Sequence, residues 1–238
     1  MAHGEIGAGA AAGEADLRPR FARWGLNPKR QGTRPTCSVF VATAALEYAM
    51  TERRGRPVRL SEEFLNWAAN RAAGEDLDGA FFHDLWSGYR LHGICREAHM
   101  PYAGAFDAGA RPSPTAMRSA ARNRAAGLEL RWVKAWDVTT GLTIGQMDGI
   151  RAALRGGAPV WAGLRWPKQP EWRDGALQPC GPDAVYDGHS VLLVGFRDDV
   201  GWPGGGVFRF HNSAGPSPEG LLPYAFAREY TNDAAWIG

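Results

Sequence analysis

Four residues in this sequence are of the types that an acyl-transfer reaction uses, and Cys37 is the candidate nucleophile among them. It stands where the polar segment QGTRPT gives way to the alanine-rich apolar run SVFVATAALEYAM. If that run is a helix, unpaired backbone N–H groups and the positive end of the helix dipole face the sulfur, and both favour a thiolate. A lone cysteine in such a place is commonly a small buried hydrophobe, so a nucleophile needs a base elsewhere.

His189 and Asn212 are the candidate partners of this thiol. His189 begins the apolar run HSVLLVGF, and Asn212 follows the run VFRFH. Both runs resemble strands, and adjacent antiparallel strands bring the start of one beside the end of the next. An asparagine there would hold the imidazole ring while the ring takes up the thiol proton. We therefore expect His189 to be the base and Asn212 to orient it.

Gln31 lies six residues before Cys37 and supplies a side-chain amide N–H. Together with the backbone N–H of Cys37 it would make a two-donor oxyanion hole for a tetrahedral intermediate. The four residues would then supply every group that an acyl-transfer mechanism needs: a nucleophile, a base, a group that orients the base, and an oxyanion donor.

The elements that must position these residues differ between the two halves of the chain. Helical signals dominate the first half: an apolar segment from Cys37 to Met50, a start at Ser61 followed by two glutamates, and apolar residues at helical spacing from Phe81 to a stop at Gly93. A further helix is expected between Ser113 and Gly127, whereas residues 16–35, rich in Pro, Gly and Arg, are expected to be extended.

The second half follows the strand period more closely. Strands are expected at LELRWVKAWDV, APVWAGLRW and in the two runs around His189 and Asn212, with one helix between Thr143 and Gly156. Trp161 is expected in the core, and Trp166 and Trp172 at the border of a surface loop. The fold class is therefore α+β with two packed lobes: a disordered leader (1–16), a mainly helical lobe carrying Cys37 (17–110) and a mainly β lobe carrying His189 and Asn212 (111–238).

Several motifs, in this order, resemble the papain family of cysteine peptidases. They are Gln31-Gly32, Cys37, Phe40, LSEEFL from Leu60, Gly93-Ile94, Pro101-Tyr102, GHSVLLVGF from Gly188 and HNSAG from His211. Cys37 and His189 are separated by about 150 residues, as in that family's signature. The resemblance implies one papain-like domain with a helical left lobe, a β-barrel-like right lobe and a cleft between them. It also implies that Cys37, His189, Asn212 and Gln31 are the catalytic residues.

Three positions depart from the family pattern. Ser38 follows the nucleophile where the family has an aromatic residue, and Arg34 stands in place of a cysteine that forms a disulfide. Ala214 replaces the tryptophan that shields the His–Asn hydrogen bond from water, and the following loop is shortened to PSPEG. We therefore expect a more hydrated His189–Asn212 pair and reduced or altered activity.

The substrate-binding residues are inferred from the same resemblance. DGAFF, from Asp78, resembles the glycine-containing strand that holds substrate backbone, with Gly79 as the backbone contact. Phe82 would line a pocket whose floor, at Gly188, carries no charge, so an apolar side chain is expected there. Because only 36 residues precede Cys37, no long inhibitory pro-segment is expected, and a regulatory protein partner is one possible restraint.

Charge and cysteine content exclude other classes of function. Lys plus Arg number 27 against 25 for Asp plus Glu, a net charge of +2 without a long block of like charge, so neither nucleic acid nor a membrane surface is an expected partner. The three cysteines lack CxxC spacing, which argues against a disulfide framework or a metal site, and no cofactor is expected. A secretory signal is not recognisable at the N-terminus, so a cytoplasmic location is expected.

The leading hypothesis is a papain-like cysteine protease or amidase that cleaves a peptide or amide bond through a Cys37 acyl-enzyme. Two alternatives use the same fold. A catalytically silent module would keep the cleft to bind a peptide or partner, and an acyl or amide transferase would resolve the acyl-enzyme with an amine instead of water.

Overall fold

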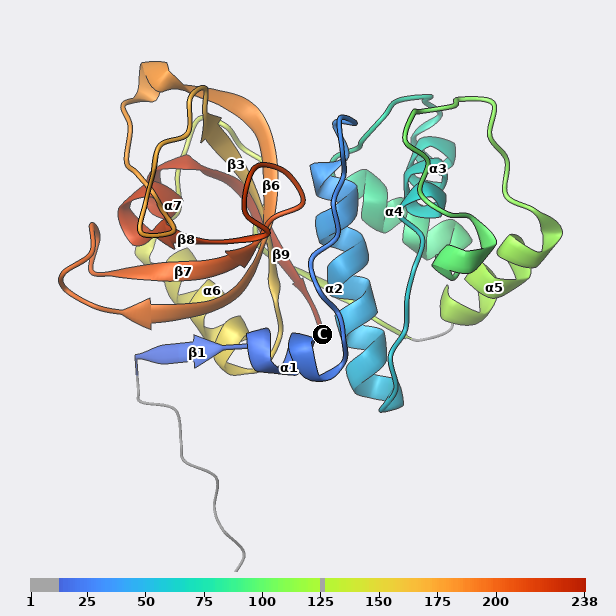
Figure 1. The fold of residues 1–238 in the computed structure, drawn as a ribbon, viewed down its shortest axis with the longest axis horizontal. Coiled ribbons are helices and arrows are strands. Elements are labelled where there is room, and N and C mark those ends of the chain that lie inside the picture. The colour runs from blue at the N-terminus through green and yellow to red at the C-terminus, as the bar shows by residue number, and fades with distance from the viewer. Residues whose placement is uncertain (1–12, 125–126) are drawn as a thin grey trace, which may run out of the picture.

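The chain forms a helical lobe and a lobe built around a β-sheet in a computed structural model, which describes residues 13–124 and 127–238 (Figure 1). The fold is α+β with two lobes, as the sequence predicted. The helical lobe contains α2 (Cys37–Arg54), α3 (Glu62–Ala73), α4 (Phe82–His92), α5 (Pro114–Arg124) and the short 3-10 helix η1 (Glu97–His99). The β lobe contains the sheet together with α6 (Ile144–Arg155), α7 (Tyr224–Tyr230) and η2 (Pro182–Ala184).

Local signals place the helix ends where the sequence predicted them. Helix α2 ends at Gly55, whose φ of 60° is the left-handed conformation that glycine adopts without strain. The Ser61 hydroxyl accepts a hydrogen bond from the backbone N–H of Phe64 and so caps α3. Thr143 and Gln146 form a reciprocal capping box at the start of α6.

The sheet is mostly antiparallel and has the strand order β2-β9-β3-β6-β7-β8-β5-β4, with β1 paired to β6. Its members are β1 (Glu14–Asp16), β2 (Leu130–Lys134), β3 (Val160–Pro167), β4 (Trp172–Arg173), β5 (Ala176–Leu177), β6 (Val185–Asp198), β7 (Gly206–His211), β8 (Glu219–Pro223) and β9 (Thr231–Ile237). Only the β5–β8 pair is parallel among the described strands. The long strand β6 is central, because it pairs with β3 on one side and with β7 on the other.

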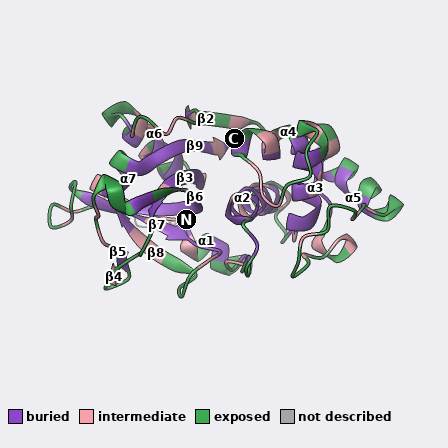
Figure 2. Ribbon diagram, turned by 90° about the horizontal axis from the view of Figure 1, so that it is seen from above, coloured by how far each residue is buried: buried purple, intermediate pink, exposed green. Residues whose placement is uncertain are grey.

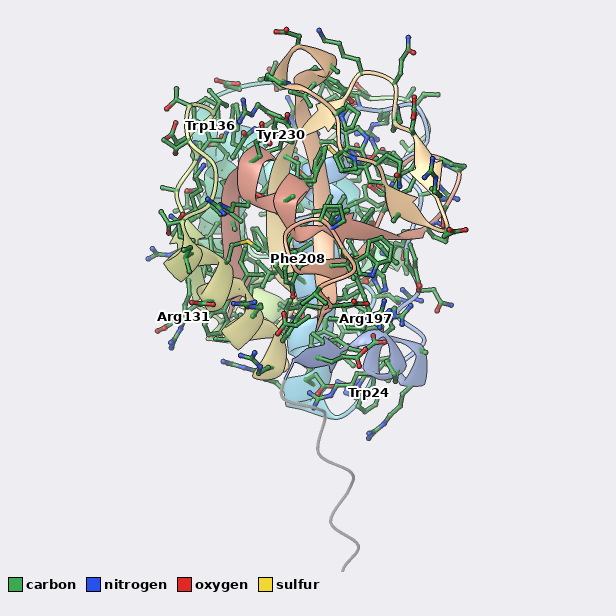
Figure 3. All side chains as sticks on the ribbon, turned by 90° about the vertical axis from the view of Figure 1, so that its left-hand side faces the viewer. Trp24, Arg131, Trp136, Arg197, Phe208 and Tyr230 are labelled. Carbon is green, nitrogen blue, oxygen red and sulfur yellow. The ribbon has the colours of Figure 1, made fainter. Side chains whose placement is uncertain are left out.

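Helix α2 forms much of the boundary between the lobes. Most of its residues are buried, and it packs against α3 and α4 on one side and β6 on the other; seen nearly end-on in Figure 2, its turns are mainly purple. The β lobe has its own aromatic core: Phe208 lies in the middle of the face seen in Figure 3, and its side chain is fully buried. Trp161 is also fully buried, as expected.

The N-terminal part of the described chain is more ordered than the sequence suggested. The expected leader, 1–16, was wrong at its end, because Glu14–Asp16 pairs with β6; residues 1–12 lie outside the described residues. The segment expected to be extended contains α1 (Arg18–Arg23). Pro19 is compatible with the first turn of a helix, and Phe21 packs into the core, so burial outweighs the weak local signal.

The boundary between the lobes lies later in the chain than the expected residue 110. Helix α5 packs with the helical lobe, because its Ala116 and Ala120 share a buried cluster with Phe64 and Ala68 of α3. In the described part of the chain, none of the helices is both long and apolar enough to span a membrane.

Candidate active site

Cys37 is the first residue of α2, and its side chain is 9% exposed. The thiol donates to the backbone carbonyl of Gly188, with 3.8 Å between Sγ and the oxygen. Burial raises the pKa of the Cys37 thiol, although the backbone N–H and hydroxyl of Ser190 and the N–H groups of Ser38 and Cys37 itself favour the thiolate. The sulfur therefore contacts the residues on both sides of His189.

His189 and Asn212 are in direct contact. Nε2 of His189 lies 2.9 Å from Oδ1 of Asn212, and both residues are buried. The same oxygen accepts the backbone N–H of Ala214 at 3.2 Å, which fixes the orientation of the amide. Because a carbonyl oxygen only accepts, Nε2 carries the proton and Nδ1 of the neutral ring is free to accept one. Burial lowers the pKa of His189, and the Asn212 hydrogen bond opposes this shift only in part.

A cavity of about 430 Å³ lies at this junction of the lobes, and both Cys37 and His189 line it. Its other walls include the three residues expected to bind substrate: Gly79, Phe82 and Gly188. These residues come from three widely separated segments of the chain, which meet at one cavity beside the thiol.

Gln31 is placed differently from the other three candidate catalytic residues. It is not among the residues that line the cavity, and its Nε2 donates to the backbone carbonyl of Arg34 at 2.7 Å. Its Oε1 accepts from the Ser213 hydroxyl at 2.7 Å, and its backbone N–H donates to the Ser213 carbonyl at 3.0 Å. These bonds join Gln31 to the residue directly after Asn212.

Gly79 occupies a position that only glycine fits. Its φ is +97°, and a Cβ atom there would lie 2.4 Å from the backbone oxygen of Pro35. Its N–H donates to Oδ1 of Asn66 at 3.0 Å. The strand that the family resemblance implied at residues 78–82 was wrong, because residues 78–81 form a loop and α4 begins at Phe82. Asn66 and Asn70 hold this loop by bonds to the backbone of Leu77 and Gly79.

Aromatic side chains at the rim of the cavity were not identified from the sequence. Phe82 is only 2% exposed and packs edge-on against Trp161, so it forms a back wall. Phe81 and Trp136 also line the cavity, are 53% and 48% exposed, and lie 5.6 Å apart. Trp136, labelled in Figure 3, comes from the β lobe, whereas Phe81 precedes α4, so this pair bridges the lobes. Nothing local in the sequence indicates that the two rings meet.

Asp233 corrects the expectation of an uncharged pocket. It lines the cavity and is 4% exposed, and burial raises the pKa of its carboxyl to about 7, with Lys134 and the Gly163 N–H opposing the shift. A Cβ atom on Gly163 would lie 2.0 Å from Oδ1 of Asp233, so that glycine leaves the space the carboxyl occupies. The sequence signal was a single aspartate inside the apolar strand TNDAAWI.

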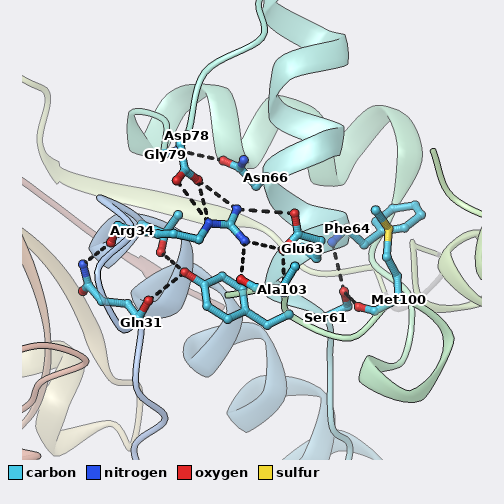
Figure 4. A network of polar contacts seen from close by, with 12 residues as sticks. Gln31, Arg34, Ser61, Glu63, Phe64, Asn66, Asp78, Gly79, Met100 and Ala103 are labelled. Carbon is cyan, nitrogen blue, oxygen red and sulfur yellow. Dashed lines mark hydrogen bonds and ion pairs between the residues drawn. The ribbon is translucent and has the colours of Figure 1, made fainter. Parts of the chain in front are cut away.

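Arg34, which stands where the family pattern has a disulfide-forming cysteine, joins several parts of the site (Figure 4). Its guanidinium is 4% exposed and lies 2.8 Å from Asp78 and 2.6 Å from Glu63, and it also donates to the carbonyl of Ala103. Its own carbonyl accepts the Gln31 amide. Burial acts to lower the pKa of Arg34, but the hydrogen bonds to the two carboxylates outweigh it and raise that pKa. Arg34 thus connects the loop before Cys37 to the loop carrying Gly79.

Two further expectations were wrong at the His189–Asn212 pair. The pair was expected to be hydrated because of Ala214, yet His189 and Asn212 are only 7% and 4% exposed. Trp166, expected beside a surface loop, is 6% exposed and packs against the His189 ring, with 4.6 Å between the ring centroids.

A cysteine at the start of a helix contacts the two residues that flank a strand-borne histidine, and that histidine pairs with an asparagine directly after the next strand. This arrangement, at the junction of a helical and a β lobe, is that of the papain-like fold. Comparison with solved structures supports this assignment. The chain is similar to xylellain, a cysteine protease from Xylella fastidiosa, with a TM-score of 0.75 and 20% identity over 96% of this chain and 86% of that one.

Two pro-forms share the same fold. Digestive procathepsin L 3 of the Tenebrio molitor larval midgut matches with a TM-score of 0.63 and 20% identity, over 98% of this chain and 73% of that one. The proform of the ragweed pollen cysteine protease Amb a 11 matches with a TM-score of 0.66 and 21% identity, over 96% and 68%. No protein-family model and no curated protein sequence matches the chain. At these identities the likeness establishes the papain-like fold.

Proposed function

We propose that this protein is a cysteine protease or amidase that hydrolyses a peptide or amide bond through an acyl-enzyme on Cys37. The observation that carries the proposal is the 2.9 Å His189–Asn212 hydrogen bond on a strand whose neighbouring residues contact the Cys37 sulfur. The cysteine proteases among its structural neighbours support the same class of chemistry.

In the first step, Nδ1 of His189 takes the thiol proton and the sulfur attacks the carbonyl carbon of the substrate. The backbone N–H of Cys37 is the first donor to the resulting oxyanion, and Gln31 would become the second by turning its amide from the Arg34 carbonyl toward the cavity. The protonated His189 then donates its proton to the leaving nitrogen, the C–N bond breaks, and a thioester remains. Water, deprotonated by His189, attacks the thioester, and the acid and the thiol are released.

The directions of their pKa shifts indicate that Cys37 and His189 are both neutral before substrate binds. Burial raises the pKa of Cys37 and lowers the pKa of His189, so each group alone resists becoming charged. Proton transfer between them creates two opposite charges at once, which offset one another in the low-dielectric site. Asn212 stabilises the imidazolium by accepting its Nε2–H bond.

The cavity favours a substrate with a cationic side chain. Asp233 supplies a buried carboxyl in the wall, and Phe81 and Trp136 offer aromatic surface at the rim for the stem or charge of a lysine or arginine. Gly79 lies where a peptide backbone would pass. This replaces the apolar preference expected from the sequence.

The test of the proposed function is labelling with a thiol-directed electrophile over a range of pH, with Cys37→Ala as the control. Cys37 should react well before Cys95, which is fully buried, and before the partly exposed Cys180. Labelled protein should also lose hydrolysis of a peptide library. Equal labelling of the three thiols would contradict the proposal.

A catalytically silent peptide-binding module is the second candidate. It is favoured by Gln31, whose Nε2 is already bonded to Arg34 and which does not line the cavity. Peptide binding without turnover would support it. Transfer to an amine is distinguished by product analysis with added amine, since hydrolysis yields the free acid and transfer yields a new amide.

We also propose a cytoplasmic location and leave open a regulatory protein partner. The position of the family disulfide is taken by Arg34 and its carboxylate partners, a connection that reducing conditions do not break. Fractionation of the native cells would test the location.

A further inference from the structure

We propose that Trp166 is a positioning residue for His189, taking the shielding role that Ala214 cannot fill. The inference rests on the proposed function of Cys37 and His189. It concerns how this chain keeps the His189–Asn212 hydrogen bond dry and the imidazole ring fixed.

The register of β3 and β6 places the two rings together. Leu164 of β3 lies opposite His189 of β6, and the register slips at the next step, where Arg165 lies opposite Asp187. The skipped residue is Gly188, whose φ is +120°. Trp166 is two residues beyond Leu164, so strand alternation puts it on the same face as His189. The two ring centroids lie 4.6 Å apart, with 62° between the ring planes.

The indole is itself held in place from several sides. Its centroid lies 6.2 Å from that of Phe210 in β7, 6.4 Å from Phe226 in α7 and 6.3 Å from Trp172. Phe210 and Phe226 are each 1% exposed. A ring packed in this way cannot move aside to admit water, because its neighbours already fill the space.

The segment that follows Asn212 offers the pair little cover. Ala214 is half-buried and has only a methyl group, and residues 215–219 are exposed. Asn212 is nevertheless 4% exposed and its hydrogen bond to His189 is 2.9 Å long. Cover from the β3 side accounts for this, since Trp166 is the aromatic ring that contacts His189 in the described structure.

The orientation of the His189 ring matters because Nδ1 must accept the proton of Cys37 while Nε2 stays bonded to Asn212. The Asn212 bond restrains one end of the ring, and the indole restrains its plane. Exclusion of water from the Nε2–H···Oδ1 bond also strengthens it. Trp166 therefore acts through His189 and does not touch the reacting atoms.

The experiment compares Trp166→Ala and Trp166→Phe with Trp172→Ala, which removes a neighbouring tryptophan one ring further from His189. Circular dichroism and thermal melting establish that each variant folds. The readouts are the solvent-exchange rate of the His189 Nε2–H, followed by NMR, and the rate of Cys37 alkylation against pH.

Trp166→Ala should speed exchange of the His189 Nε2–H with solvent. It should also slow alkylation of Cys37 by about tenfold and shift its pH profile, because a less firmly oriented His189 removes the thiol proton less efficiently. Trp166→Phe and Trp172→Ala should stay close to the parent. Adding Ala214→Trp to Trp166→Ala should slow the exchange again by covering the pair from the other side.

Unchanged proton exchange and an unchanged pH profile in a folded Trp166→Ala protein would overturn the inference. The proposed function fails separately: if the parent Cys37 is not selectively alkylated, the Nε2–H exchange still reports whether Trp166 shields His189.

Discussion

The Nε2 atom of His189, near the start of β6, lies 2.9 Å from Oδ1 of Asn212, directly after β7. The two strands are antiparallel neighbours, with Leu192 opposite His211, so the beginning of one strand meets the end of the other. An imidazole proton and an asparagine oxygen are thereby paired in a buried place, with the nucleophile candidate on the adjacent helix.

Asn212→Ala should lower Cys37 alkylation and any turnover by at least about tenfold, because His189 loses its orienting partner. It should also cost about 1–3 kcal/mol of stability, since the Nε2–H is left buried without an acceptor. Urea unfolding and alkylation kinetics measure the two effects. Asn123→Ala is the matched control, because Asn123 is equally buried but bonds to Ile94 in the helical lobe. Equal effects of both variants on alkylation would contradict the role of Asn212.

Arg34→Ala should destabilise the protein by about 3–5 kcal/mol, because Glu63 and Asp78 would keep their charges without the guanidinium between them. Arg34→Lys should recover part of this lost stability, because lysine keeps the positive charge. The recovery should be incomplete, because an ammonium group cannot reproduce the forked contacts of the guanidinium. Arg111→Ala, at an exposed arginine that bonds only to nearby carbonyls, should change stability by less than about 0.5 kcal/mol. Denaturant unfolding gives all three values, and a negligible loss for Arg34→Ala would show that the network does not hold the loops.

Asp233→Asn should remove a pH-dependent loss of stability. The folded-state pKa of Asp233 is raised to about 7, above its ordinary value of 3.8, so between these pH values the folded chain holds a proton that the unfolded chain releases. Stability therefore falls as pH rises from about 4 to 7, by up to about 4 kcal/mol, and is constant above. The variant should be flatter across this range and more stable than the parent at pH 8. Identical pH profiles of unfolding would refute the assignment.

Asp233 should also set the charge preference of the cavity. As pH rises through about 7, its carboxyl ionises and hydrolysis of peptides with lysine or arginine at one position should gain over peptides with leucine there. Asp233→Asn should abolish this pH-dependent gain while leaving leucine peptides nearly unaffected. A positional library assayed at pH 6 and 8 identifies the position, and a parent enzyme that prefers leucine at both values would exclude the cationic substrate.

Gly79→Ala should weaken peptide binding, whereas the control Gly74→Ala should not. A Cβ atom there collides with the Pro35 oxygen and displaces the loop on the cavity wall. Gly74→Ala is a matched control, because Gly74 also has a positive φ, of +75°, but no atom lies within 4 Å of the added Cβ. The control should show only the backbone strain of about 1–3 kcal/mol. Peptide titration and thermal unfolding of both variants separate strain from the collision.

The sequence alone was sufficient for features governed by neighbours along the chain. The start of α2 at Cys37, the Ser61 cap and the Thr143 cap depend on residues within one helical turn, and each was found where expected. The pairing of His189 with Asn212 was also foreseeable, because it needs only two adjacent antiparallel strands. The expected extended segment failed at α1, where tertiary burial of Phe21 decided the conformation.

The surroundings of the candidate catalytic residues were decided by tertiary structure. Trp166 meets His189 through the pairing of β3 with β6, and Asp233 fits beside β3 because Gly163 has no side chain. Arg34 reaches Glu63 and Asp78 across loops far apart in sequence. Contacts of this kind depend on strand register, on the packing of the two lobes and on burial, none of which a local pattern of residues encodes. The sequence thus determined which residues could react, and the folded chain determined how dry, how charged and how firmly held their site is.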